Sequence, residues 1–158
     1  MRTITREAHY NRNVGDDMDS LTHAIVGGSI GVAISTYYTG SIEPVFVFNG
    51  ILFAEIADFD ILQSIKNPAK KMKYHRSGSH SLFVFPIIVL FACLAIAFFG
   101  KYNFFMLYLT GFLAYLSHIG LDLLNSYGTK IFWPFSRKRY AMDILPIWDR
   151  WILIIFLC

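Results

Sequence analysis

Residues Leu82 to Phe99 read LFVFPIIVLFACLAIAFF and form the most apolar stretch of the chain. An uncharged run of this length is typical of a helix that spans a bilayer. The residues from His75 to His80 read HRSGSH and stand just before this run, so that two imidazoles and one guanidinium precede it closely. The stretch therefore predicts a membrane-spanning helix with candidate metal ligands at the membrane surface where it begins.

The composition also indicates a membrane protein. Hydrophobic residues make up 55% of the chain and aromatic residues 17%, and the mean hydropathy is +0.47. These values exceed those of typical soluble domains. The net charge is only +3 and no basic stripe is evident, so no nucleic-acid partner is expected. Cys93 and Cys158 are not spaced like metal ligands or a disulfide framework.

Three further segments are apolar enough to predict membrane spans, and they cover residues 21–38, 45–62 and 104–124. In the first of them, Gly27, Gly28 and Gly31 predict a small-residue face that packs closely against a neighbouring helix. Trp151 to Cys158 is predicted to be the start of a fifth span. The expected fold is therefore an all-α membrane protein, a bundle of four transmembrane helices plus the start of a fifth, with cytoplasmic loops.

The first seventeen residues, 1–17, are polar and lack the apolar core of a signal peptide, so they are predicted to be a disordered extension. Asp19, Ser20 and Thr22 are residue types that cap helix N-termini, and an apolar segment follows them. We therefore expect one transmembrane domain at 18–158, truncated at its C-terminus, with either Met1 or Met18 as the true start.

The distribution of basic residues predicts the topology. All of the fourteen Lys and Arg residues except Lys101 fall in the N-terminal extension or in the loops 63–81 and 125–150. Basic residues accumulate on the cytoplasmic side of membrane proteins. A multi-pass protein of the inner (plasma) membrane, with these segments in the cytoplasm, is therefore expected.

This topology gathers the ligand-type side chains at the cytoplasmic ends of four helices. The predicted metal ligands are His23, Asp58, Asp60, His75, His80, His118 and Asp122. Since His118 and Asp122 are four residues apart, they share one helix face and can reach the same ion. Asp58 and Asp60 would be splayed by about 200° on a helix, so one is expected to bind metal while the other orients a histidine, binds a second ion or acts as a base.

A mixed His and Asp set of this size suits two divalent ions, with zinc favoured and manganese as the alternative. Such ions would polarise a phosphoryl or carbonyl oxygen and activate water. The predicted catalytic residues are Asp58, Asp60 and Arg76. Arg76 would hold an anionic substrate oxygen, although it could equally be a cytoplasmic anchor of the membrane helices.

Five motifs carry a resemblance to a known family. They are Met18-Asp19-Ser20-Leu21-Thr22-His23, Asp58-Phe59-Asp60, His75-Arg76-Ser77-Gly78-Ser79-His80, Ser117-His118-Ile119-Gly120-Leu121-Asp122, and Ser126-Tyr127-Gly128-Thr129 followed by Trp133-Pro134-Phe135-Ser136. Together they resemble the bacterial and archaeal inner-membrane, metal-dependent hydrolases of the YdjM/YbcI type, also labelled LexA-binding. Where that family typically has Pro, Gly and Thr, this chain has Ala57, Ser77 and Ser79, and every candidate ligand is retained.

A second resemblance concerns the order of the ligands. The order His, Asp, His and then His-x-x-x-Asp is similar to that of zinc-dependent phospholipase C and P1 nuclease enzymes, and this likeness implies that Asp122 bridges two ions. A phosphatidate-type phosphatase fits poorly, because that family requires an Arg where this chain has Phe112.

The expected function is a membrane-bound metal-dependent hydrolase that acts on a phosphoester or phospholipid at the cytoplasmic membrane surface. Its expected partners are the lipid bilayer and a lipid substrate. The alternative is a non-enzymatic membrane scaffold whose basic loops dock a soluble cytoplasmic protein such as a repressor.

Overall fold

The computed structural model describes residues 2–3, 20–60, 79–124, 128–142 and 144, with the backbone alone for residues 2, 3, 59 and 60. The described chain is mostly helical, and its elements are α1 (Ser20–Thr39), α2 (Pro44–Glu55), the 3-10 helix η2 (Ile56–Asp60), α5 (Phe85–Gly100) and α6 (Phe104–Leu124). Two short strands, β1 (Arg2–Thr3) and β2 (Tyr140–Ala141), pair in an antiparallel manner. The predicted all-α architecture is confirmed for these segments.

Two of the predictions concern residues that are largely outside this description. The predicted start of a fifth span, 151–158, lies outside the described residues altogether. Of the predicted extension 1–17, only Arg2 and Thr3 are described, and they form β1. The disordered state of the rest of the extension stays a prediction.

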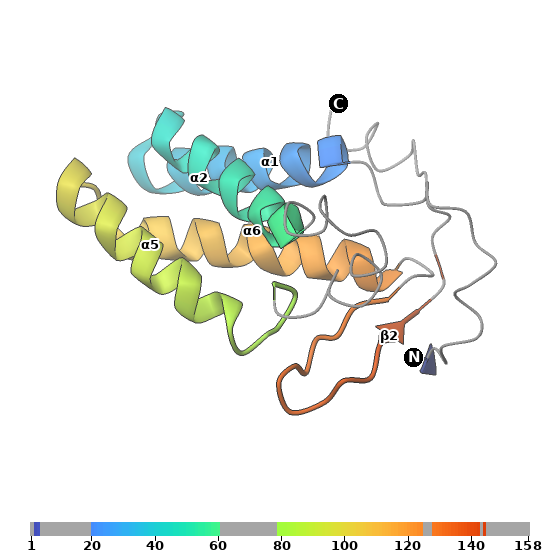
Figure 1. Ribbon diagram of the computed structural model, residues 1–158. Helices are drawn as coiled ribbons and strands as arrows, with labels where there is room; N and C mark the ends of the chain where they lie inside the picture. The colour runs from blue at the N-terminus through green and yellow to red at the C-terminus, as the bar shows by residue number, and fades with distance from the viewer. Residues whose placement is uncertain (1, 4–19, 61–78, 125–127, 143, 145–158) are drawn as a thin grey trace.

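The helices form two hairpins that share one end (Figure 1). Short turns join α1 to α2 and α5 to α6, so the helices of each pair run antiparallel. Helix α6 contacts each of the other three. This arrangement brings the start of α1, the end of α2, the start of α5 and the end of α6 to the same end of the bundle.

Among the described helices, α6 alone is long and apolar enough to cross a bilayer by length and composition. Helix α5 is shorter, with 16 residues, because it begins at Phe85 and has Pro86 in its first turn, a position that proline favours. Helix α2 ends at Glu55 and tightens into η2. Membrane spanning by the other three predicted helices therefore stays a prediction.

The outward face of α5 is nevertheless strongly apolar. Phe85, Val89 and Cys93 recur every four residues and are buried against the bundle. The opposite face exposes large apolar side chains, namely Ile87, Ile88, Phe91, Leu94, Phe98 and Phe99. Soluble proteins rarely expose a continuous patch of this kind. The surface is suited to contact with lipid.

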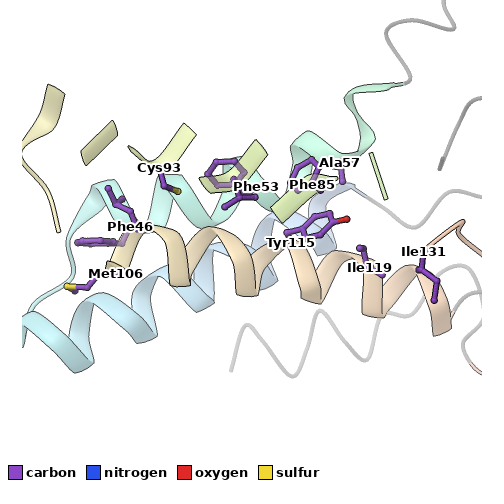
Figure 2. Close-up of a cluster of buried hydrophobic side chains, with 11 residues drawn as sticks. Phe46, Phe53, Ala57, Phe85, Cys93, Met106, Tyr115, Ile119 and Ile131 are labelled. Atoms are coloured by element: carbon purple, nitrogen blue, oxygen red, sulfur yellow. The ribbon is translucent and has the colours of Figure 1, made fainter. Parts of the chain in front are cut away.

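Aromatic side chains join α2, α5 and α6 in the core (Figure 2). The rings of Phe85 and Tyr115 are stacked with centroids 4.1 Å apart, and Phe53 meets Phe85 edge to face at 6.4 Å. One polar group lies among them. The buried Asn49 side chain donates through Nδ2 to the Leu107 carbonyl at 2.9 Å, and its Oδ1 is 3.9 Å from the Cys93 sulfur.

Helices α1 and α2 approach each other through glycines, as the sequence predicts. A Cβ added at Gly27 would lie 2.5 Å from the Gly50 carbonyl oxygen, and one added at Gly31 would lie 2.4 Å from the Phe46 carbonyl oxygen. Only residues without a side chain allow this contact between backbones. The predicted packing face is therefore confirmed, with Gly50 of α2 as its counterpart.

Candidate metal centre

Four ligand-type side chains converge where the two hairpins meet. Asp58 comes from η2, His80 from the turn before α5, and His118 and Asp122 from the last two turns of α6. One potential ligand atom of each side chain lies within 4.8 Å of those of the other three. Among the described residues, these four side chains are the group that could hold a metal ion. His80, His118 and Asp122 are buried, whereas the Asp58 side chain is 21% exposed. Asp58 therefore marks the side of the site that opens to the surface.

The spacing of these atoms fits a single small cation. His80 Nε2 lies 3.1 Å from His118 Nε2, 3.1 Å from Asp122 Oδ2 and 3.5 Å from Asp58 Oδ1. His118 Nε2 lies 3.7 Å from Asp58 Oδ1 and 3.8 Å from Asp122 Oδ2. Bonds of 2.0–2.1 Å to a tetrahedral zinc ion would place the donor atoms about 3.3–3.4 Å apart. The five distances, 3.1–3.8 Å, therefore lie on both sides of the ideal edge of such a tetrahedron.

The charges of the cluster also favour a cation. Buried carboxylates are costly unless a positive group compensates them. The two histidines cannot both serve as imidazolium ions, because their Nε2 atoms would then face each other at 3.1 Å as like charges. A divalent cation at the centre would instead accept a lone pair from each imidazole and balance both carboxylates. The residues present thus fit the metal that the resemblance implies.

His23 extends the cluster on the α1 side. Its ring lies over that of His118, with centroids 4.0 Å apart and an angle of 35° between the planes. Its Nε2 is 3.9 Å from Asp122 Oδ1, which is the oxygen that does not face His80. The two oxygens of Asp122 are therefore directed toward different imidazoles.

The structure thus brings together five of the seven predicted ligands. Asp60 belongs to η2, but its side chain is not among those described. His75 and Arg76 lie outside the described residues, so the roles predicted for them stay predictions.

The turn that carries His80 is held by contacts that the sequence did not indicate. The Tyr115 hydroxyl donates to the Ser81 carbonyl oxygen at 2.8 Å. The Ser81 hydroxyl accepts the amides of Phe83 and Val84 at 3.2 Å each, and it donates to the Trp133 carbonyl. The sequence offered one indication that Tyr115 belongs near the site, because Tyr115 stands one helical turn before His118 in a predicted span. Its partner, Ser81, could not be inferred from spacing.

A second link joins α1 to the end of α2 beside the site. The Ser20 hydroxyl donates to the Glu55 carboxylate. Ser20 stands one turn before His23, and Glu55 stands one turn before Asp58. The contact therefore fixes the two helix ends that supply one ligand-type side chain each.

Tyr115→Phe is expected to weaken metal binding about tenfold, because groups that orient metal ligands typically contribute 10–100-fold to affinity. The variant removes only the hydroxyl that anchors the His80 turn and keeps the ring stacked on Phe85. Competition with a chromogenic chelator would measure the affinity. Tyr108→Phe is the matched control, since Tyr108 lies on the same helix and stacks on Phe104 and Phe112. Equal affinities in the two variants would contradict the positioning role.

Comparison with known proteins adds family information to this geometry. Residues 18–158 match the family described as YdjM inner membrane protein. The chain is also similar to the uncharacterized protein YfhP of Bacillus subtilis (strain 168), with 30% identity over 145 residues that cover 87% of this chain. It spans only 43% of the length of that relative. No solved structure matches the chain.

Proposed function

Because the chain belongs to the YdjM family of inner membrane proteins, we propose that it is a membrane-bound, metal-dependent hydrolase of phosphoesters. The observation that carries the proposal is the convergence of Asp58, His80, His118 and Asp122, with one donor atom of each within 4.8 Å of the others. Ionisable residues in apolar helical bundles are costly to retain and usually serve a function.

The four clustered side chains are proposed to hold a divalent cation. His80, His118 and Asp122 would hold a divalent cation from the buried side, and Asp58 would complete its shell from the open side. A cation bound there would polarise a phosphoryl oxygen and make water more acidic. Zinc is the favoured ion, because two imidazoles and two carboxylates at tetrahedral spacing suit it, and manganese is the alternative.

Two ions are proposed, since the carboxylate of Asp122 is shared. Its Oδ2 faces His80 at 3.1 Å and its Oδ1 faces His23 at 3.9 Å, so Asp122 would bridge a buried ion and a second ion on the His23 side. Four protein ligands would fill the tetrahedral coordination shell of the buried ion, whereas a hydrolytic metal needs one coordination position free for water or substrate. The second ion, which has fewer protein ligands, would supply that position. His75 is a proposed further ligand there.

The remaining roles are proposed for Asp60 and Arg76, whose side chains are not among those described. Asp60 is the proposed general base, because it follows Asp58 by two residues and is not needed for the four-donor set. Arg76 is proposed to hold an anionic oxygen of the substrate. Both residues would act on the cytoplasmic side, where the basic loops are expected to lie.

The proposed substrate is a phospholipid or a lipid-linked phosphate. The site lies at the end of the bundle where α5 begins, and the apolar outward face of α5 extends away from it. If that face lies in the hydrocarbon, the site is level with the headgroups. A lipid held in the bilayer would then present its phosphate to the site with little loss of entropy.

The test is to incubate protein loaded with zinc or manganese with a panel of phospholipids and with soluble phosphodiesters in micelles. We expect phosphate or headgroup release from at least one phosphoester and none with His80→Ala, which removes a donor atom. Turnover of peptides or carboxylic esters alone would show that the substrate class is wrong. No turnover and no bound metal would support the membrane scaffold that docks a soluble partner.

A further inference from the structure

The segment after α6 forms a braced loop whose two ends meet. Thr129 and Tyr140 exchange two backbone hydrogen bonds of 3.0 Å, which close the loop. Inside it, the Trp133 amide donates to the Lys130 carbonyl at 3.0 Å and the Ser136 amide donates to the Phe132 carbonyl at 2.8 Å. Compact loops that bond to themselves in this way have little conformational entropy left to lose on binding.

The loop is also attached to the helical body at both sides. The Leu82 amide donates to the Ile131 carbonyl at 3.1 Å, and the Met142 amide donates to the Leu123 carbonyl at 2.7 Å. The loop turns back from the end of α6 and lies on the side of the bundle where α5 begins (Figure 1). Side chains at its tip are therefore held at a fixed place relative to the helices.

Its most exposed aromatic side chain continues the apolar face of α5. Phe135 is 80% exposed, and its ring lies 5.1 Å from that of Phe83, edge to face. Phe83 is itself exposed and stands four residues before Ile87 on the outward face. Phe135 thus places a large apolar ring in line with a surface suited to lipid.

The charge of the same loop is entirely positive. Between Gly128 and Met142 the sequence contains four basic residues and no acidic residue. Arg137 and Lys138, two and three positions after Phe135, are exposed. An exposed aromatic ring beside exposed cations is the combination that stabilises a segment in the headgroup region of an anionic membrane.

We propose that the 128–142 loop is an interfacial anchor, with Phe135 inserted among the headgroups of an anionic leaflet and Arg137 and Lys138 paired with lipid phosphates. A soluble protein partner is less suited to this surface. Phe135 lies in line with the apolar face of α5, so a soluble partner bound to Phe135 would collide with a bilayer that covers that face. The anchor goes beyond the proposed hydrolysis and does not depend on it.

The test places an environment-sensitive fluorophore at position 135 by Phe135→Cys in a Cys158→Ser background, with the buried Cys93 left in place. In vesicles that contain anionic phosphatidylglycerol, we expect quenching by lipids that carry a quencher near the headgroup. We also expect iodide in the water to quench the label several-fold less than it quenches free dye. A label at Phe91→Cys, near the middle of the outward face of α5, serves as the reference for a site in the hydrocarbon.

The contribution of charge is tested by adding Arg137→Gln and Lys138→Gln. Two cations at roughly 1 kcal/mol each favour the inserted loop about thirtyfold, so this variant should regain iodide quenching in anionic vesicles. Parent and variant should behave alike in neutral phosphatidylcholine. Iodide quenching equal to that of free dye, protection from both kinds of quencher, or no difference between anionic and neutral vesicles would each overturn the proposal.

Discussion

Asp122→Ala is expected to lower the affinity for metal more than about a hundredfold, the upper limit for residues that only orient ligands. The carboxylate lies at the centre of the cluster. Its Oδ2 is 3.1 Å from His80 Nε2 and 3.8 Å from His118 Nε2, and its Oδ1 is 3.9 Å from His23 Nε2. If it bridges two ions, its removal affects both. His23→Ala, in contrast, is expected to remove only the second ion.

Elemental analysis of detergent-purified protein would measure these changes as metal ions per chain. Wild-type protein should hold two ions, His23→Ala one, and Asp122→Ala fewer than one. Ser117→Ala is a matched control, because Ser117 neighbours His118 on α6 and its hydroxyl donates to the Ala114 carbonyl at 2.7 Å. Full metal content in Asp122→Ala would exclude Asp122 as a ligand, and a single ion in the wild type would exclude the bridge.

Gly27→Leu should destabilise the fold by at least about 3 kcal/mol, at the upper end of the cost of overpacking. The added Cβ alone would meet the Gly50 carbonyl oxygen at 2.5 Å and the Ala54 Cβ at 2.6 Å. Neither neighbour can turn away, because one belongs to the backbone and the other is fixed to it. Helices α1 and α2 would have to separate, which would move His23 and Asp58 apart.

Unfolding in mixed micelles with increasing denaturing detergent would measure this loss. The control is Gly120→Ala, since a Cβ at this position on α6 would meet no atom within 4 Å. Alanine is favoured over glycine inside a helix by about 0.5–1 kcal/mol, so the control should be slightly more stable than the wild type. If Gly27→Leu unfolded at the same detergent concentration as the wild type, the close packing of α1 and α2 would be wrong.

Much of the helical architecture could be predicted, because continuous apolar runs between turn residues are visible in the sequence. The prediction for 104–124 coincides with α6, and that for 21–38 lies within α1. The second segment was predicted to continue to Leu62, whereas α2 ends at Glu55. That early end could not be predicted, since Ile56 and Ala57 suit a longer helix and the tighter turn of η2 depends on packing.

The candidate site was predictable in part for a similar reason. The spacing of His118 and Asp122 places both on one helix face, and the order of the hairpins brings His23, Asp58 and His80 to the same end of the bundle. The bond from Tyr115 to Ser81 joins residues 34 positions apart, and no local pattern encodes such a contact. The position of the Asp58 carboxylate in this group also depends on the tighter turn of η2, which no local sequence pattern predicts.

Asn49 has a consequence for the register of the bundle. A slip of α2 along α6 by one turn, about 5.4 Å, would leave its amide without the Leu107 carbonyl in an apolar interior, where an unpaired polar group costs several kcal/mol. The same slip would carry Asp58 away from His80 and His118. One hydrogen bond near the middle of the bundle therefore helps to set the position of the Asp58 carboxylate at its end, and the geometry of the candidate metal site depends in part on a residue outside it.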